Sequence, residues 1–203
     1  MAINNIIFDL GGVIFKIDYD LTASAFKELG LQQFDSLYSK KKQDHFFDNF
    51  EKGKLSVEDF RKEVKAYLPE SVTDTQIDMA WNAMLIGIPE GRTDWLKEIG
   101  KKYRIFLLSN TNYIHINGFQ PMVGPDFELL FEKVYYSCFL GMRKPDAEIF
   151  QLVIDENNLV AEETLFIDDS PQHVVGGAAV NLISRQLIDG VQVEDFVSAL
   201  LKS

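Results

Sequence analysis

The chain has little cysteine, no excess of positive charge and no long apolar run. Cys138 is the only cysteine among 203 residues, so an internal disulfide bond is impossible and a reducing compartment is expected. The formal net charge of −11 argues against nucleic acid or an anionic membrane as a partner, since both need a basic patch. No apolar stretch reaches the length of a membrane span, and the first residues lack the pattern of a signal peptide. We therefore expect a cytoplasmic protein.

The first predicted strand runs directly into an aspartate. The segment Asn4–Val13 reads NNIIFDLGGV, with a short apolar run before Asp9. Such a run is typical of a strand that is buried on both faces, and the Gly11–Gly12 pair is expected to end it. Asp9 should then stand at the carboxyl end of a central strand, which is where ligands bind in open α/β sheets.

The next part of the chain, residues 16–88, has the periodicity of helices. Leu21–Leu29 is amphipathic, and Ser56 and Thr73 each begin a pattern that resembles a capping box. The second of these helices is expected to include Leu85. No strand is predicted in this part, which therefore interrupts the pattern on either side of it.

From residue 89 onward, short apolar strands alternate with helices. Two of the later helices are expected to begin at a proline, Pro145 and Pro171. Alternation of this kind predicts an α/β fold with a doubly wound parallel sheet. We expect residues 1–15 and 89–203 to form one Rossmann-like core with residues 16–88 inserted into it. The predicted strands after the first are Arg104–Leu108, Lys133–Ser137, Leu165–Ile167 and Leu182–Ser184.

Polar side chains follow three of these strands. Right-handed crossovers bring the carboxyl ends of parallel strands to one edge, so Asp9, Ser109 and the pair Asp168–Asp169 are expected to meet there, with Lys144 from a nearby loop. Clustered carboxylates repel one another and call for a cation, and an all-oxygen site suits Mg²⁺. Ser109 and Lys144 are suited to hold a phosphoryl group, and Asp9 is a competent nucleophile towards phosphorus.

Four segments, FDLGGVI, LLSNT, GMRKP and FIDDS, resemble in this order the four motifs of the haloacid dehalogenase (HAD) superfamily. The resemblance spans the whole chain, and residues 16–88 resemble its helical C1-type cap. Within the superfamily, the chain is similar to bacterial phosphatases of the α-D-glucose-1-phosphate phosphatase type. The resemblance implies a Mg²⁺-dependent phosphatase of a small phosphorylated metabolite, such as a sugar phosphate, as a monomer or homodimer.

The resemblance also implies roles for particular residues. Asp9 forms an aspartyl-phosphate intermediate, and Mg²⁺ is held by Asp9, the main-chain carbonyl of Gly11 and Asp168, with Asp169 nearby or acting through water. The residues expected to bind the phosphate are Ser109, Asn110, Lys144 and Gly12, and Lys144 is also expected to act in catalysis.

The chain departs from the superfamily at Gly11, where most of its phosphatases have a second aspartate. That aspartate protonates the leaving oxygen, and loss of such help costs about 10²- to 10⁴-fold in rate. One hypothesis is that the substrate compensates, because the anomeric oxygen of a sugar 1-phosphate is a good leaving group. Asp18, Asp20 and His45 are further candidates for a proton donor.

Two other functions stay open at this point. Asp9 could attack carbon in a metal-free 2-haloacid dehalogenase, although the Asp168–Asp169 pair would then only repel the substrate. The chain could also be a non-catalytic binding protein that has lost its general acid at Gly11. His115 and His173 are expected to be surface or structural residues, because nothing in the sequence pairs them.

Overall fold

The computed structural model describes residues 2–34, 38 and 45–202, and its centre is a five-stranded parallel sheet with strand order β5-β4-β1-β6-β7. All four residues of the central strand are buried, and its Ile6 pairs with residues of both neighbouring strands. The predicted doubly wound α/β fold is confirmed. The strands are β1 (Asn5–Phe8), β4 (Arg104–Ser109), β5 (Lys133–Tyr136), β6 (Thr164–Asp168) and β7 (Ile183–Gln186).

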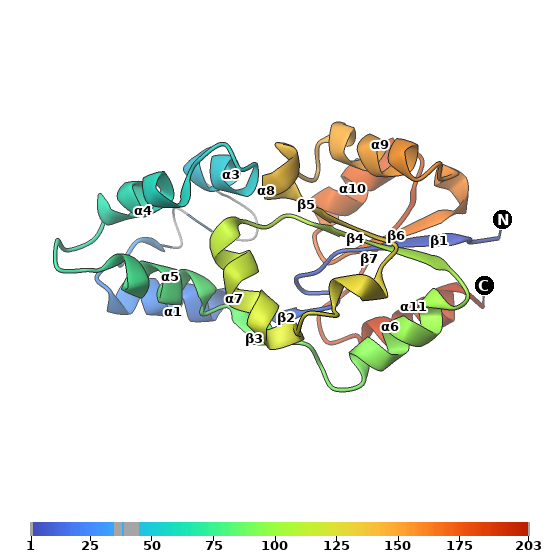
Figure 1. Ribbon diagram of the computed structural model, residues 1–203, viewed down its shortest axis with the longest axis horizontal. Helices are drawn as coiled ribbons and strands as arrows, with labels where there is room; N and C mark the ends of the chain where they lie inside the picture. The colour runs from blue at the N-terminus through green and yellow to red at the C-terminus, as the bar shows by residue number, and fades with distance from the viewer. Residues whose placement is uncertain (1, 35–37, 39–44, 203) are drawn as a thin grey trace.

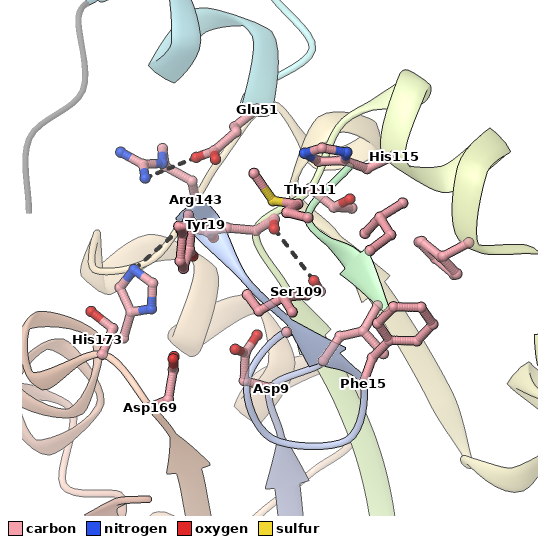
Figure 2. A pocket seen from close by; sticks show the side chains of 18 of the residues that line it. Asp9, Phe15, Tyr19, Glu51, Ser109, Thr111, His115, Arg143, Asp169 and His173 are labelled. Carbon is pink, nitrogen blue, oxygen red and sulfur yellow. Dashed lines mark hydrogen bonds and ion pairs between the residues drawn. The ribbon is translucent and has the colours of Figure 1, made fainter. Parts of the chain in front are cut away.

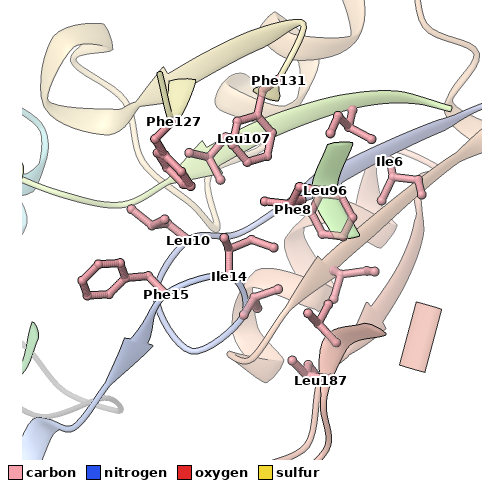
Figure 3. Close-up of a cluster of buried hydrophobic side chains, with 14 of the residues drawn as sticks. Ile6, Phe8, Leu10, Ile14, Phe15, Leu96, Leu107, Phe127, Phe131 and Leu187 are labelled. Atoms are coloured by element: carbon pink, nitrogen blue, oxygen red, sulfur yellow. The ribbon is translucent and has the colours of Figure 1, made fainter. Parts of the chain in front are cut away.

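Helices cover both faces of this sheet (Figure 1). On one face, side chains of α6 (Arg92–Gly100), α7 (Tyr113–Val123) and α11 (Val193–Leu200) pack in a hydrophobic cluster with Phe8 and Leu107, as Figure 3 shows for part of the cluster. On the other face, α9 (Ala147–Glu156) packs on Phe106 and Phe166. The helix α10 (Pro171–Ala179) lies beside β6 and β7.

A group of helices follows the first strand and lies at one end of the molecule (Figure 1). The group has its own hydrophobic cluster, in which Trp81 contacts the rings of Phe26, Phe47 and Phe60. Ile114, from α7, also belongs to this cluster, so α7 joins it to the core of the sheet. The helices are α1 (Tyr19–Glu28), α3 (His45–Glu51), α4 (Val57–Lys65) and α5 (Asp74–Asn82).

A two-stranded antiparallel sheet forms where the chain leaves the core and where it returns. Its strands are β2 (Lys16–Ile17) and β3 (Leu85–Gly87). The sequence prediction placed Leu85 in a helix and was wrong there, because the pairing of β3 depends on a strand about 70 residues earlier. Three short helical segments complete the elements: η1 (Glu128–Leu130), α8 (Ser137–Leu140) and η2 (Ala161–Glu163).

The start of one helix also differs from the prediction. Pro145 is not its first residue, since Pro145 lies in a turn and α9 begins at Ala147. The amide of Asp146 donates to the carbonyl of Arg143, which closes this turn ahead of the helix. Pro171 begins α10 as predicted. Across the described part of the chain, every helix is too short or too polar to cross a membrane.

Candidate active site

The carboxyl edge of the sheet brings together the acidic residues that the sequence singled out. Asp9 follows β1 directly, and Asp168 is the last residue of β6, the strand paired with β1. Carboxylate oxygens of Asp9, Asp168 and Asp169 lie within 4.8 Å of one another. Ser109 is the last residue of β4, the other neighbour of β1, and lines the same cavity.

Lys144 lies between two of these carboxylates, and its side chain is fully buried. Its Nζ donates to Oδ1 of Asp9 at 2.7 Å, to Oδ2 of Asp168 at 2.6 Å and to the carbonyl of Leu108 at 2.8 Å. All three of its protons therefore have acceptors. A buried ammonium in this geometry neutralises part of the acidic cluster and fixes the orientation of the Asp9 carboxylate.

Asn110 holds the loop that carries Lys144. Its Nδ2 donates to the carbonyl of Lys144, and its Oδ1 accepts from the amide of Lys144, both at 2.9 Å. The amide side chain of Asn110 is thus engaged with the main chain of the loop. This arrangement positions Lys144, and the role in phosphate binding that the resemblance implies for Asn110, which lines the cavity, stays a prediction.

The acidic cluster places several negative charges close together in a buried site, and this shifts the pKa values of its carboxyl groups. Burial raises the pKa of Asp9 to about 8, with Lys144 opposing this shift and the other two carboxylates adding to it. Burial also raises the pKa of Asp168, but Lys144 and His173 outweigh that effect and hold it well below its usual value. When all three carboxylates are ionised they exceed the one ammonium, so a divalent cation would balance their charge and favour the ionised form of Asp9.

The glycines after Asp9 are in close contact with their surroundings. Gly12 has a φ of +77°, and a Cβ atom there would lie 2.4 Å from Oδ2 of Asp169, so only glycine fits. A Cβ atom at Gly11 would lie 3.1 Å from Cδ1 of Ile17, in β2. A larger residue at position 11 therefore requires Ile17 to move.

Ser109 and Asp169 are not helix caps, although each stands just before a helix. The cap of α7 is Asn112, whose Oδ1 accepts from the amide of His115. The cap of α10 is Ser170, and its amide donates to Asp168. Both Ser109 and Asp169 line the cavity.

His173 and His115 are not surface residues: both line the same cavity, and each ring contacts another side chain, so of the two predicted roles only the structural one stays open. Nδ1 of His173 lies 3.0 Å from Oδ1 of Asp168. His173 follows Asp168 by five positions, in the first turn of α10, and that spacing could have indicated the contact. His115 lies in the first turn of α7, and nothing near it in the sequence indicates its partner, Asn82.

Glu51 and Arg143 complete the part of the cavity farthest from the sheet (Figure 2), and sequence reasoning missed both. Nη2 of Arg143 lies 2.8 Å from Oε2 of Glu51, and Nη1 donates to Asp48 at 2.7 Å. Glu51 ends α3 and Arg143 immediately precedes Lys144, so this ion pair joins the inserted helices to the loop that carries the lysine.

Known proteins resemble this chain along most of its length. The family described as haloacid dehalogenase-like hydrolase matches residues 3–181. D-Ribitol-5-phosphate phosphatase from Bacteroides thetaiotaomicron is 32% identical over 99% of this chain and 100% of its own length. The sesquiterpene phosphatase astK from Aspergillus oryzae is 27% identical over 91% of this chain and 90% of its own.

A solved structure is similar over nearly the whole chain. It is a HAD family enzyme from Bacteroides thetaiotaomicron in complex with magnesium and inorganic phosphate. The two chains are 32% identical, with a TM-score of 0.83 over 96% of this chain and 99% of the other.

Proposed function

The chain belongs to the haloacid dehalogenase-like hydrolases, and from that premise we propose that it is a Mg²⁺-dependent phosphatase of a small phosphorylated sugar or sugar alcohol. The observation that carries the proposal is the buried cluster in which Lys144 bridges Asp9 and Asp168 beside Asp169. An ester phosphate placed over this cluster meets a nucleophile, an ammonium group and ligands for a cation.

The three carboxylates fit Mg²⁺ by their chemistry. They offer oxygen ligands within 4.8 Å of one another, and their surplus of negative charge disfavours leaving the site without a cation. Asp9, Asp168 and Asp169 would hold the ion, together with the carbonyl of Gly11. When bound, the ion supplies positive charge next to the phosphoryl oxygens. The magnesium and phosphate bound to the Bacteroides enzyme support this proposal.

Asp9 is oriented for attack by the contact that Lys144 makes. Lys144 holds Oδ1, and no described residue donates a hydrogen bond to Oδ2, which is therefore the oxygen available to phosphorus. In the proposed step, a bond forms between Oδ2 and phosphorus, and the bond to the ester oxygen breaks. Water then cleaves the acyl phosphate, which releases inorganic phosphate and regenerates Asp9. Ser109 is proposed to bind a phosphoryl oxygen throughout, and the ammonium of Lys144 to balance the negative charge of the phosphoryl group from its place between Asp9 and Asp168.

The identity of the substrate is a further part of the proposal. The Bacteroides relative acts on ribitol 5-phosphate, whose leaving group is a primary alkoxide. The sequence-based prediction named a sugar 1-phosphate, whose better leaving group would offset the missing aspartate at Gly11. We favour the sugar-alcohol phosphate because that relative matches along its whole length. The part of the chain in residues 16–88 is proposed to act as the cap over the substrate.

Phosphate release from a small panel would test the function. We expect turnover of D-ribitol 5-phosphate with Mg²⁺ and none with EDTA, and the panel also holds glucose 1-phosphate, glucose 6-phosphate and farnesyl phosphate. Equal rates on the two glucose phosphates would refute the leaving-group hypothesis. Turnover of a 2-haloacid that resists EDTA would favour the dehalogenase, and a folded protein inactive on every ester would favour a binding role.

Asp9→Asn is the matched control for this assay. We expect the variant to be folded, as judged by circular dichroism, but inactive on every ester because the amide is a poor nucleophile. A phosphoenzyme trapped by acid quench from the unsubstituted protein should carry its phosphate on Asp9. Modification of any other residue would overturn the proposed mechanism.

A further inference from the structure

His115 lines the cavity on the side where α7 and the inserted helices meet (Figure 2). Its ring stacks on the indole of Trp81, with the ring centroids 4.9 Å apart and the planes inclined by 9°. Its side chain is not involved in the acidic cluster. The proposed chemistry therefore gives no reason for a histidine at this position.

The hydrogen bonds of Asn82 determine which ring nitrogen of His115 carries the proton. Nδ2 of Asn82 donates to the carbonyl of Ile114 at 3.3 Å, so Oδ1 is the atom that lies 2.9 Å from Nδ1 of His115. An amide oxygen only accepts, and Nδ1 must therefore be the protonated nitrogen. In a neutral ring, Nε2 is then an unprotonated acceptor.

The ring is held in its neutral form. Burial lowers the pKa of His115 to about 3, and no carboxylate opposes that shift. Asn82, the partner of Nδ1, does not line the cavity, whereas Nε2 is not among the fully buried side-chain atoms without a partner in the described part of the chain; Nε2 is therefore the ring nitrogen that is accessible from the cavity. Among the residues that the structure describes, none donates a hydrogen bond to Nε2.

We propose that His115 determines specificity by accepting a hydrogen bond from a substrate hydroxyl at Nε2, so that the site selects polyhydroxylated phosphate esters over apolar ones. The inference rests on the proposed phosphatase function and deepens it. Glu51 and Arg143 lie in the same part of the cavity and present further polar groups to such a substrate.

The apolar wall of the cavity is the main argument for a different substrate, such as a prenyl phosphate. That substrate would bury Nε2 of His115 without a donor, and burying a polar group without a hydrogen-bond partner weakens binding. The volume of the cavity is also only about 100 Å³, which favours a small substrate. The apolar lining residues are Leu10, Phe15, Ile17, Met84, Leu85 and Phe119.

Three substitutions at position 115 separate the hydrogen bond from the packing. His115→Gln keeps a polar oxygen near the position of Nε2, whereas His115→Asn keeps one only near Nδ1. His115→Phe keeps the ring on Trp81 and removes both. We compare kcat/KM for D-ribitol 5-phosphate with kcat/KM for ethyl phosphate, which has no hydroxyl group.

We expect His115→Phe and His115→Asn to lower kcat/KM for ribitol 5-phosphate by about 10- to 100-fold and to change that for ethyl phosphate by less than about 3-fold. His115→Gln should recover most of the loss. Equal losses on both esters would overturn the inference and assign His115 a structural role. A preference for farnesyl phosphate that His115→Phe strengthens would identify an apolar substrate instead.

A binding measurement keeps this test separate from that of the proposed function. In the Asp9→Asn protein, calorimetry should show that ribitol 5-phosphate binds at least about 10-fold more tightly than ethyl phosphate, and that His115→Phe removes the difference. If the unsubstituted protein turned over no ester but this difference in affinity were found, the proposed phosphatase function would be refuted and the hydroxyl contact would stand. Equal affinities for the two esters would refute the contact whether or not the protein is a phosphatase.

Discussion

Single residues decide which proton transfers this site can make. Gly11 provides no acid, and the nearest described side chain to an added Cβ atom is Ile17, at 3.1 Å. The groups that line the cavity close to Asp9 are Ser109, Asp169 and His173, and none occupies the position of the aspartate found in related phosphatases. Under the proposed mechanism, the leaving oxygen would be protonated with less help than in those enzymes.

Gly11→Asp should restore part of that help. We expect kcat for D-ribitol 5-phosphate to rise by about 10-fold or more, while kcat for p-nitrophenyl phosphate stays within about 2-fold, because only the poor leaving group needs an acid. Steady-state rates on the two esters measure this. The same substitution combined with Ile17→Val controls for the crowding by Ile17. Unchanged rates on both esters, with the protein folded, would refute the missing-acid argument.

His115 should make the stability of the protein fall in acid. Its pKa is about 3 in the folded protein and 6.5 as its ordinary value, so the unfolded chain binds the extra proton between these values. Stability is therefore full above pH 6.5 and is lost as the pH falls towards 3. At pH 5 the unsubstituted protein should have lost about 2 kcal/mol of its free energy of unfolding through this group, a loss that His115→Phe does not show.

Urea unfolding of both proteins from pH 7 to pH 4 would measure this difference, because other titrating groups are common to the two and cancel. Stability curves that stay parallel over this range would show that His115 is not buried in its neutral form.

At the scale of elements, one side chain ties the turn after β1 to the last helix. Arg92, at the start of α6, is buried, and its guanidinium donates to the carbonyls of Val13 and Ile14 and to the side chains of Gln192 and Glu194. The glycine turn next to Asp9 therefore depends on α6 and on the beginning of α11. Neither connection follows from local sequence patterns, because an arginine in the first turn of a helix usually lies in solvent.

Arg92→Met should lower the free energy of unfolding by about 3 kcal/mol, because it leaves buried carbonyls without donors and Glu194 without its partner. Arg92→Lys keeps the charge but not the planar set of donors of the guanidinium. Its free energy of unfolding should therefore lie between those of the unsubstituted protein and Arg92→Met. Chemical denaturation measures both. Arg104→Met is the matched control, since its pair with Glu132 is exposed and should contribute less than about 1 kcal/mol. Equal effects of the Arg92 and Arg104 substitutions would contradict this account.

At the scale of the whole molecule, the cavity lies where two hydrophobic cores meet. One core belongs to the sheet and the other to the helices around Trp81, and α7 contributes side chains to both. The acidic cluster belongs to the sheet, whereas Glu51 belongs to the inserted helices. Substrate binding is therefore expected to depend on the relation between the two parts, and metal binding on the sheet alone.

Mg²⁺ should stabilise the folded chain, because only the folded state brings the three carboxylates together. At a concentration of 100 times its Kd, the ion would add about 2.7 kcal/mol, which corresponds to a rise in Tm of about 5–10 °C for a protein of this size. Differential scanning calorimetry measures the shift. Asp168→Asn should reduce it, and an equal shift with NaCl at matched ionic strength would argue against a specific site.

The sequence by itself determined the sheet and its acidic edge. Apolar runs such as Ile6–Phe8 are buried on both faces wherever parallel strands alternate with helices, and right-handed crossovers place the strand ends together. Asp9, Ser109, Asp168 and Asp169 could be found for that reason. The ends of the predicted strands differ by one or two residues from those observed, since strand ends depend on the neighbouring strands.

Only the tertiary structure decided which residues surround the substrate. The pairs His115–Asn82, Arg143–Glu51 and Lys144–Asp9 join positions 33, 92 and 135 residues apart, and no local pattern predicts the first two. Their side chains acquire their charge state and orientation from partners that distant segments bring close and remove from water. Patterns along the chain record periodicity and burial, whereas the chemistry of a buried polar group depends on its neighbours in space.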